Sequence, residues 1–196
     1  MFVRSLSLGV AAAAVMVGGA QAADLIIPTT PQPIYESAGF DWEGLYAGAR
    51  IGAQWVGTND YGNIPAGASI TQGVVGAAVG VNFIPVDPFL LGAEVTGDYV
   101  WGNNLSTGEF FANLRAGAVV TDNVLVYALG GVGVQSGPNN SSTTGLYQLG
   151  GGVEVAVTDA ITVRGEIVGQ GDFNNTGASD PFFETAKATV GVFYHF

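Results

Sequence analysis

The stretch of sequence that decides the fold reads Leu45-Tyr46-Ala47-Gly48-Ala49-Arg50-Ile51-Gly52-Ala53-Gln54-Trp55. Its odd-numbered positions are all apolar, whereas its even-numbered positions carry Tyr, Gly, Arg, Gly and Gln. A period of two is that of a β-strand with one apolar face, and eleven residues is about the length of one tilted strand across a membrane. This stretch therefore predicts a two-faced strand.

The same alternation returns in seven further segments, which are 73–83, 90–101, 110–120, 124–135, 146–157, 161–170 and 185–196. The predicted outward rows include Val75, Ala77, Val79, Val81, Phe83; Leu91, Ala93, Val95, Tyr99, Trp101; Phe110, Ala112, Leu114, Ala116, Ala118, Val120; and Tyr147, Leu149, Val153, Val155, Val157. The segment 124–135 leaves two options open, because Leu125, Tyr127 and Leu129 compete with Val126, Ala128 and Val132 for the outward face. In total, eight strands are predicted.

Short connections that carry an aspartate divide these segments at a regular interval. They are Val86-Asp87-Pro88, Thr121-Asp122-Asn123 and Thr158-Asp159-Ala160, so the aspartates are 35 residues (87 to 122) and 37 residues (122 to 159) apart. Longer polar stretches alternate with them, at Gly57 to Ala68, Gly102 to Gly108, Ser136 to Thr144 and Gly171 to Phe183. Short turns at one end and longer loops at the other predict an all-β fold, an eight-stranded antiparallel up-and-down transmembrane β-barrel over residues 42–196.

The composition also differs from that of a soluble domain. Charged residues make up 11% of the chain, against about 25% in typical globular proteins, and the mean hydropathy is +0.37. The strongly apolar runs Gly73 to Val81 and Val124 to Val134 are shorter than the ~20 residues that a transmembrane helix needs. A closed barrel is the other structure that satisfies its backbone in lipid.

Alternation alone does not say which face points inward, and a soluble barrel of the lipocalin type would enclose its apolar face. Charge placement favours the membrane barrel, because the few charges of the strands share the polar face and would coat a soluble barrel very sparsely. The predicted lumen charge cluster consists of Arg50, Glu94, Asp98, Arg115, Glu154, Arg164, Glu166 and Lys187. The aromatic residues predicted at the membrane interfaces are Trp42, Trp55, Tyr99 and Trp101.

The beginning of the chain predicts export. Arg4 precedes an uncharged apolar run from Leu6 to Val17, and Ala20-Gln21-Ala22 is a cleavage site of the A-x-A kind, so residues 1–22 are interpreted as a signal peptide. Residues 23–41 form a Pro-rich segment that we expect to act as a periplasmic tether. The chain contains no cysteine, so no disulfide can stabilise it. Its net charge of −11 argues against nucleic acid as a partner.

Both ends of the barrel region resemble a known family. Val192, Tyr194 and the terminal Phe196 alternate in a way that resembles the C-terminal signature by which outer-membrane barrels are recognised for insertion. The stretch Trp42-Glu43-Gly44-Leu45-Tyr46-Ala47-Gly48 resembles the W-x-G-x-Y-x-G first strand of the small "porin family" barrels of Gram-negative bacteria, relatives of the OmpA transmembrane domain. Residues 150–159 and 163–166 are similar to the penultimate hairpin of that family, although the final His-Phe replaces the more frequent Lys-Phe or Arg-Phe. The resemblance implies an outer-membrane location, insertion by the barrel assembly machinery, and no catalytic residues.

The charged side chains of the lumen allow two hypotheses about function. Because an eight-stranded barrel is just wide enough for side chains, the favoured hypothesis is that the charges neutralise one another and plug it, with Arg164 paired to Glu154 and Glu166. The protein would then be structural, with loops that contact lipopolysaccharide, host or phage. The alternative is a narrow porin-like channel, favoured by inward glycines that leave space for water, namely Gly48, Gly52, Gly76, Gly80, Gly92, Gly117, Gly150 and Gly152.

The sequence gives little support to the hypothesis of an enzymatic function. His195 is the sole histidine, and its position next to the C-terminus predicts a structural place at the periplasmic rim. No Ser-His-Asp set can be assembled from it at the extracellular end, where a lipid-modifying barrel would act. We therefore expect no enzymatic activity and no cofactor or metal.

Overall fold

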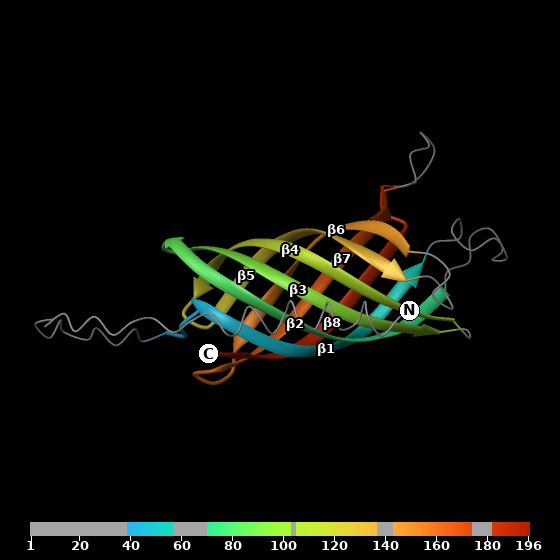
Figure 1. The fold of residues 1–196 in the computed structure, drawn as a ribbon. Coiled ribbons are helices and arrows are strands. Elements are labelled where there is room, and N and C mark those ends of the chain that lie inside the picture. Colours follow the sequence, from blue (N-terminus) through green and yellow to red (C-terminus); the bar gives the residue numbers. More distant parts are fainter. Residues whose placement is uncertain (1–38, 57–69, 103–104, 137–142, 174–181) are drawn as a thin grey trace, which may run out of the picture. The chain divides into compact units, whose positions relative to one another are not determined.

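The computed structural model describes residues 39–56, 70–102, 105–136, 143–173 and 182–196, which form one closed barrel (Figure 1). Its eight strands are β1 (Gly44–Val56), β2 (Ile70–Val86), β3 (Phe89–Gly102), β4 (Leu105–Thr121), β5 (Val124–Ser136), β6 (Thr143–Ala156), β7 (Ile161–Asp172) and β8 (Thr185–His195). Each strand pairs antiparallel with the next one, and β8 pairs with β1. The predicted fold class is confirmed. The expected signal peptide, residues 1–22, lies outside the described residues.

The strands are inclined to the barrel axis. A path that starts at Tyr46 and moves from each residue to its register partner on the next strand goes once around the barrel. It returns to β1 at Val56, ten residues further along the chain (46 to 56). Such a stagger accompanies a tilted strand in any closed barrel and fixes how wide the interior is. Because pairing is continuous around the wall, no strand edge is left open in the part of the chain that the structure describes.

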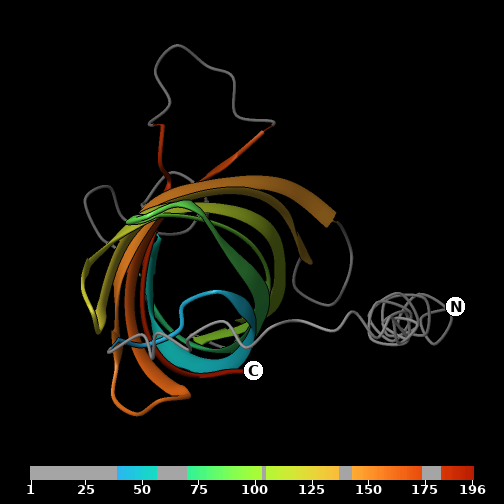
Figure 2. The same cartoon turned by 90° about the vertical axis from the view of Figure 1, so that its left-hand side faces the viewer.

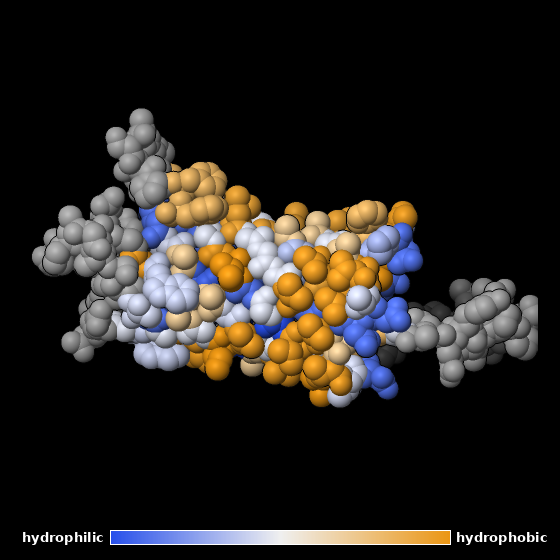
Figure 3. All heavy atoms as spheres, turned by 180° about the vertical axis from the view of Figure 1, so that it is seen from behind, coloured by the Kyte–Doolittle hydropathy of each residue, from blue (hydrophilic) through white to orange (hydrophobic). Residues whose placement is uncertain are grey.

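Alternation sorts the side chains onto two faces. Most residues of the predicted outward rows are exposed, for example Ile51 at 65% and Leu114 at 72%, and on the face seen in Figure 3 apolar residues gather over the middle of the barrel. On β5 the structure decides between the two options, because Leu125, Tyr127 and Leu129 are buried inside while Val126 and Val132 are exposed. Large apolar side chains thus dominate the outer face, and the charged side chains of the strands face inward, the reverse of a soluble domain.

The predicted loop from Gly102 to Gly108 is wrong. β3 continues to Gly102 and β4 begins at Leu105, with these two residues paired in register. The polar composition of this stretch suggested a loop, but its alternation continues the strand with Trp101 exposed and Thr107 buried. The other predicted loops, Gly57 to Ala68, Ser136 to Thr144 and Gly171 to Phe183, lie wholly or mostly outside the described residues.

We call the end with the β2–β3, β4–β5 and β6–β7 connections the turn end, and the opposite end the loop end. A strap of residues 39–43 lies in the mouth of the turn end (Figure 2). The Phe40 amide donates to the carbonyl oxygen of Asp122 (3.2 Å), between β4 and β5, and the chain then joins β1. Because β1 and β5 are four strands apart in either direction, the strap crosses the mouth from one side to the other.

Trp42 belongs to this strap, so its predicted place at the membrane interface is wrong. It is only 2% exposed and packs with Phe40, whose ring centroid is 4.7 Å away, in a cluster of apolar residues inside the barrel. Gly44 has a φ of 107°, a conformation that favours glycine, and it turns the chain from the strap into β1. The other members of this cluster are Leu90, Leu125, Tyr127, Leu129 and Val168.

Aromatic and polar side chains fill the space beside the inward glycines. A Cβ atom on Gly80 would lie 2.5 Å from Tyr46 Cζ, one on Gly152 would lie 2.5 Å from the Tyr127 hydroxyl, and one on Gly48 would lie 2.6 Å from Phe193 Cγ. All eight glycines predicted to leave space for water meet a neighbouring atom within 3.0 Å, which is a backbone atom at Gly52 and a backbone or Val168 atom at Gly150. That expectation is therefore wrong, since the missing side chains make room for rings and polar groups from neighbouring strands.

Gly152→Ala should destabilise the barrel, because its methyl group would collide with Tyr127 and with the Gly165 carbonyl oxygen, 2.6 Å away. We expect a loss of about 1–3 kcal/mol in the free energy of unfolding, measured by urea titration of the refolded protein in vesicles. Gly165→Ala, on the paired strand, is the control, because nothing lies within 4 Å of its added methyl group. Equal losses for the two variants would contradict this packing.

Candidate functional site

All eight residues of the predicted lumen charge cluster point into the barrel, and each is at most 5% exposed. They come from six strands, β1, β3, β4, β6, β7 and β8. Alternation places them on the inner face, and the narrow interior brings their side chains within contact of one another. They form two groups along the axis.

The turn-side group contains Glu94, Arg115, Glu154, Arg164 and His195. Glu154 accepts hydrogen bonds from Arg115 Nη2 (3.0 Å), Arg164 Nε (2.9 Å) and the Thr162 hydroxyl (2.6 Å). Arg164 Nη1 also donates to Glu94 Oε2 at 2.5 Å. Two carboxylates thus share two guanidinium groups in a site without exposure to water, where unpaired charge would be costly.

The loop-side group contains Arg50, Asp98, Glu109, Glu166 and Lys187. Arg50 forms a bidentate pair with Asp98 through Nε (2.9 Å) and Nη2 (2.7 Å), and its Nη1 donates to Glu166 (3.0 Å). Lys187 donates to Asp98 (2.9 Å) and to Glu109 (2.5 Å). Glu166 therefore pairs with Arg50, and the predicted Arg164–Glu166 pair is wrong. Arg164 does pair with Glu154, its register partner across the β6–β7 hairpin. Its second partner is Glu94 instead of the predicted Glu166.

Two of these ion pairs join strands on opposite sides of the barrel. β3 and β7 are four strands apart in either direction and are bridged by Glu94 and Arg164. β4 and β8 are likewise opposite and are bridged by Glu109 and Lys187. The network therefore crosses the interior at two heights.

Aromatic rings lie between the charges. The Tyr46 hydroxyl donates to Glu94 (2.9 Å) and accepts from Arg115 Nη1 (2.6 Å), while the Tyr127 hydroxyl donates to Glu166 (2.7 Å). The Arg115 guanidinium lies 3.9 Å from the centroid of the Tyr127 ring, within the range of a cation–π contact. These tyrosines, whose rings also cover the inward glycines, connect the two ionic groups to the wall.

Sequence reasoning missed two members of the network, Glu109 and His195. Glu109 and Arg115 are both odd-numbered residues of β4, so their side chains lie on the same inner face. The sequence pattern does not reveal Glu109, because the predicted loop extends to Gly108 and the predicted strand begins at residue 110. His195 was expected at the rim as a structural residue, yet its ring lies inside with Nε2 3.0 Å from Glu154 Oε1 and stacks on Tyr46 at 5.3 Å. With Glu109, the network contains five carboxyl groups and four arginine or lysine side chains, besides His195.

A layer of amides covers the loop-side group. All five glutamines of the barrel region, from five strands, point inward, and three of them donate to Glu109 at 3.3–3.4 Å. They are Gln54, Gln72, Gln135, Gln148 and Gln170. Glu109 thus collects four donors, three neutral amides and the ammonium group of Lys187, which compensates a buried carboxylate.

The remaining predicted residues lie on the outer face. Trp55, Tyr99 and Trp101 are 41–52% exposed towards the loop end, and Tyr99 stacks on Trp101 at 6.2 Å. Val192, Tyr194 and Phe196 form one outward row at the end of the chain, exposed at 54%, 50% and 77%. The Phe196 amide donates to the Leu45 carbonyl oxygen (2.9 Å), so the last residue continues the β8–β1 pairing.

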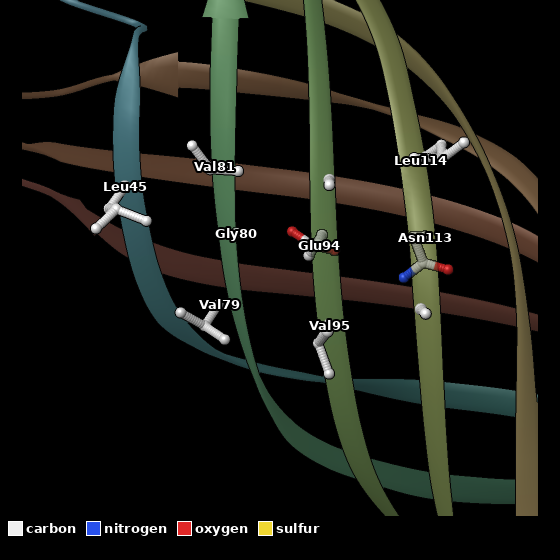
Figure 4. Close-up of a pocket in the computed structure, with 10 residues that line it drawn as sticks. Leu45, Val79, Gly80, Val81, Glu94, Val95, Asn113 and Leu114 are labelled. Carbon is white, nitrogen blue, oxygen red and sulfur yellow. The ribbon is translucent and has the colours of Figure 1, made fainter. Parts of the chain in front are cut away.

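Outside the network, one apolar groove of about 370 Å³ lies on the outer surface across β1–β4 (Figure 4). Its walls are formed by Leu45, Val79, Val81, Val95 and Leu114, and the small residues Ala93 and Ala112 leave it hollow. Glu94 and Asn113 belong to the strands at its floor, but their side chains are buried in the interior. The groove therefore presents an apolar surface without a reactive group.

Within the described residues, no group of three or more His, Asp or Glu side chains is arranged to hold a metal ion. No helix in this part of the chain is long and apolar enough to span a membrane.

A closed eight-stranded barrel with an apolar exterior and a charged interior has the fold of small outer-membrane barrels. The structure is similar to the N-terminal β-barrel domain of Pseudomonas aeruginosa OprF, with a TM-score of 0.53 and 12% identity over 79% of this chain and 98% of that one. It is also similar to Neisserial surface protein A (NspA), with a TM-score of 0.51 and 14% identity over 78% and 97% of the two chains. No family model matches the sequence, and no curated protein matches it.

Arg164→Met should destabilise the barrel, because it leaves Glu94 and Glu154 buried with fewer partners. Breaking a buried pair in this way costs about 3–5 kcal/mol, while Asp159→Asn at an exposed turn should stay within about 0.5 kcal/mol. Urea midpoints of the refolded variants measure both effects. The double variant Arg164→Met/Glu154→Gln should lose less than the sum of the two single losses, and strict additivity would mean that these side chains do not interact.

Proposed function

We propose that this protein is an integral outer-membrane barrel with a structural and surface-interaction role, and that its ion-pair network closes the lumen to steady solute flow. The observation that carries this proposal is the pair of salt bridges between opposite strands, Glu94–Arg164 and Glu109–Lys187. A side-chain bridge across the diameter leaves little room for a solute in a barrel of this size.

The outer face supports a membrane location. Large apolar side chains on every strand are exposed there, among them Leu45, Val79, Leu91, Phe110, Val132, Leu149, Ile167 and Val190. Water would make such a surface an aggregation liability, whereas lipid suits it, and the continuous pairing of the wall satisfies the backbone. The sequence features of export and the outward row that ends in Phe196 support assembly into the outer membrane, with the turn end in the periplasm.

Closure of the lumen follows from cooperativity among the charges. Opening a path along the axis would require several desolvated pairs to separate together, and each carboxylate left alone would cost several kcal/mol. The aromatic strap adds a second obstacle at the turn end, because Phe40 and Trp42 are buried in the mouth. The protein would therefore act through its surface, by contact of the loop end with lipopolysaccharide, host or phage, and not as an enzyme.

The alternative function is a narrow channel for small solutes or ions. The purified, refolded protein should show little steady conductance in planar lipid bilayers. The double variant Arg164→Ser/Lys187→Ser, which cuts both cross-barrel bridges, should open more often, and Asp159→Asn should behave as the unmodified protein. Each variant is first shown to migrate differently on an SDS gel before and after boiling, as a folded barrel does. Sustained conductance of the unmodified monomer would overturn closure and favour the channel.

A further inference from the structure

Four aromatic residues form an exposed cluster at the loop end, on the outer side of β6, β7 and β8. We call the cluster of Tyr147, Phe173, Phe182 and Phe183 the aromatic shelf. The Tyr147 ring lies 5.4 Å from that of Phe173 and 5.2 Å from that of Phe182, and Phe182 lies 4.7 Å from Phe183. Phe173, Phe182 and Phe183 are 53%, 62% and 42% exposed, although their mutual contacts hold them in place.

The rings of the aromatic shelf pack against three glycines. A Cβ atom on Gly169 would lie 2.6 Å from the Phe183 ring, one on Gly171 would lie 2.5 Å from Tyr147 Cζ, and one on Gly145 would lie 3.4 Å from Phe173. The Tyr147 hydroxyl donates to the Phe182 carbonyl oxygen at 2.5 Å, so its polar atom is already used within the cluster. The shelf therefore offers ring surface rather than hydrogen-bonding groups.

The direction of the shelf identifies its partner. The stems that lead out of β7 and into β8 extend sideways from the barrel, perpendicular to its axis (Figures 1 and 2). In a barrel that spans a membrane, this direction runs along the membrane plane and not away from it. The shelf also continues the apolar outer rows of β6 and β7, which end in Leu149 and Ile167 just below it.

We propose that the aromatic shelf lies in the interfacial layer of the outer leaflet and contacts the lipid where acyl chains meet headgroups. Aromatic rings favour this layer, and continuity with the lipid-facing band makes lipid the neighbour that the geometry supplies. The ends of β7 and β8 that carry the shelf are then anchored at the membrane surface, on one side of the barrel only. The proposal rests on the membrane location argued above, and its test separates the two.

The chain has no cysteine, so single cysteines can carry a nitroxide label. Phe182→Cys and Phe173→Cys report on the two stems of the shelf. Val190→Cys, an exposed position on the outer face of β8, is the lipid reference, and Asp159→Cys, an exposed position in the β6–β7 turn, is the water reference. Labelled proteins are refolded into phosphatidylcholine vesicles, checked by heat-dependent migration on SDS gels, and probed by collision with oxygen and with a water-soluble nickel chelate.

Both shelf labels should collide with oxygen several-fold more than with the chelate, with a ratio between those of Val190→Cys and Asp159→Cys. A shelf ratio equal to that of Asp159→Cys would overturn the proposal, because the stems would then stand in water. Protection from both reagents would also overturn it, in favour of contact with a second protein chain. If the Val190→Cys label itself collides mainly with the chelate, the membrane location is wrong. If that label collides mainly with oxygen while the shelf labels do not, only the shelf proposal is wrong.

Discussion

The structure depends on the closure of the wall by β8 against β1. Continuous pairing satisfies the strand backbone without help from solvent, which is the condition for placing apolar side chains outward. Once the exterior is apolar, the charged side chains in the middle of the strands are confined to the interior. The interior of eight strands is narrow, so charges brought there must pair with each other or remain desolvated and alone. The ion-pair network follows from this constraint.

Ionic and aromatic packing in the interior depend on each other. Tyr46 covers Gly80 and also joins Glu94 to Arg115, while Tyr127 covers Gly152 and donates to Glu166. A ring can reach the charges only because the glycine beside it lacks a side chain. The W-x-G-x-Y-x-G stretch combines these roles, since Trp42 is buried in the mouth, Gly44 turns the chain, Tyr46 enters the network, and Gly48 accommodates Phe193.

The two ends of the barrel are built differently. At the turn end, the strap brings Phe40 and Trp42 inside, and His195 joins them beside Glu154. At the loop end, amides surround Glu109 inside the barrel and the aromatic shelf extends from its outer wall. The proposed function places these ends in different compartments, with a closed periplasmic mouth and a surface that meets lipid and external partners. In the proposed function, the ionic bridges between the two ends keep the compartments separate.

The sequence by itself determined the strand pattern, the number of strands and the inward position of all eight predicted charges, because alternation is a local property that each strand displays along its own length. Apart from Arg164–Glu154, which the sequence predicts, tertiary structure decided which charges pair, since the register and tilt of the whole wall set which side chains share a height. It also placed Trp42 inside the barrel, because its burial depends on a strap that crosses to β5, and it filled the space of the glycines with rings from other strands. Such contacts lie between residues far apart in the chain, and no local pattern records them.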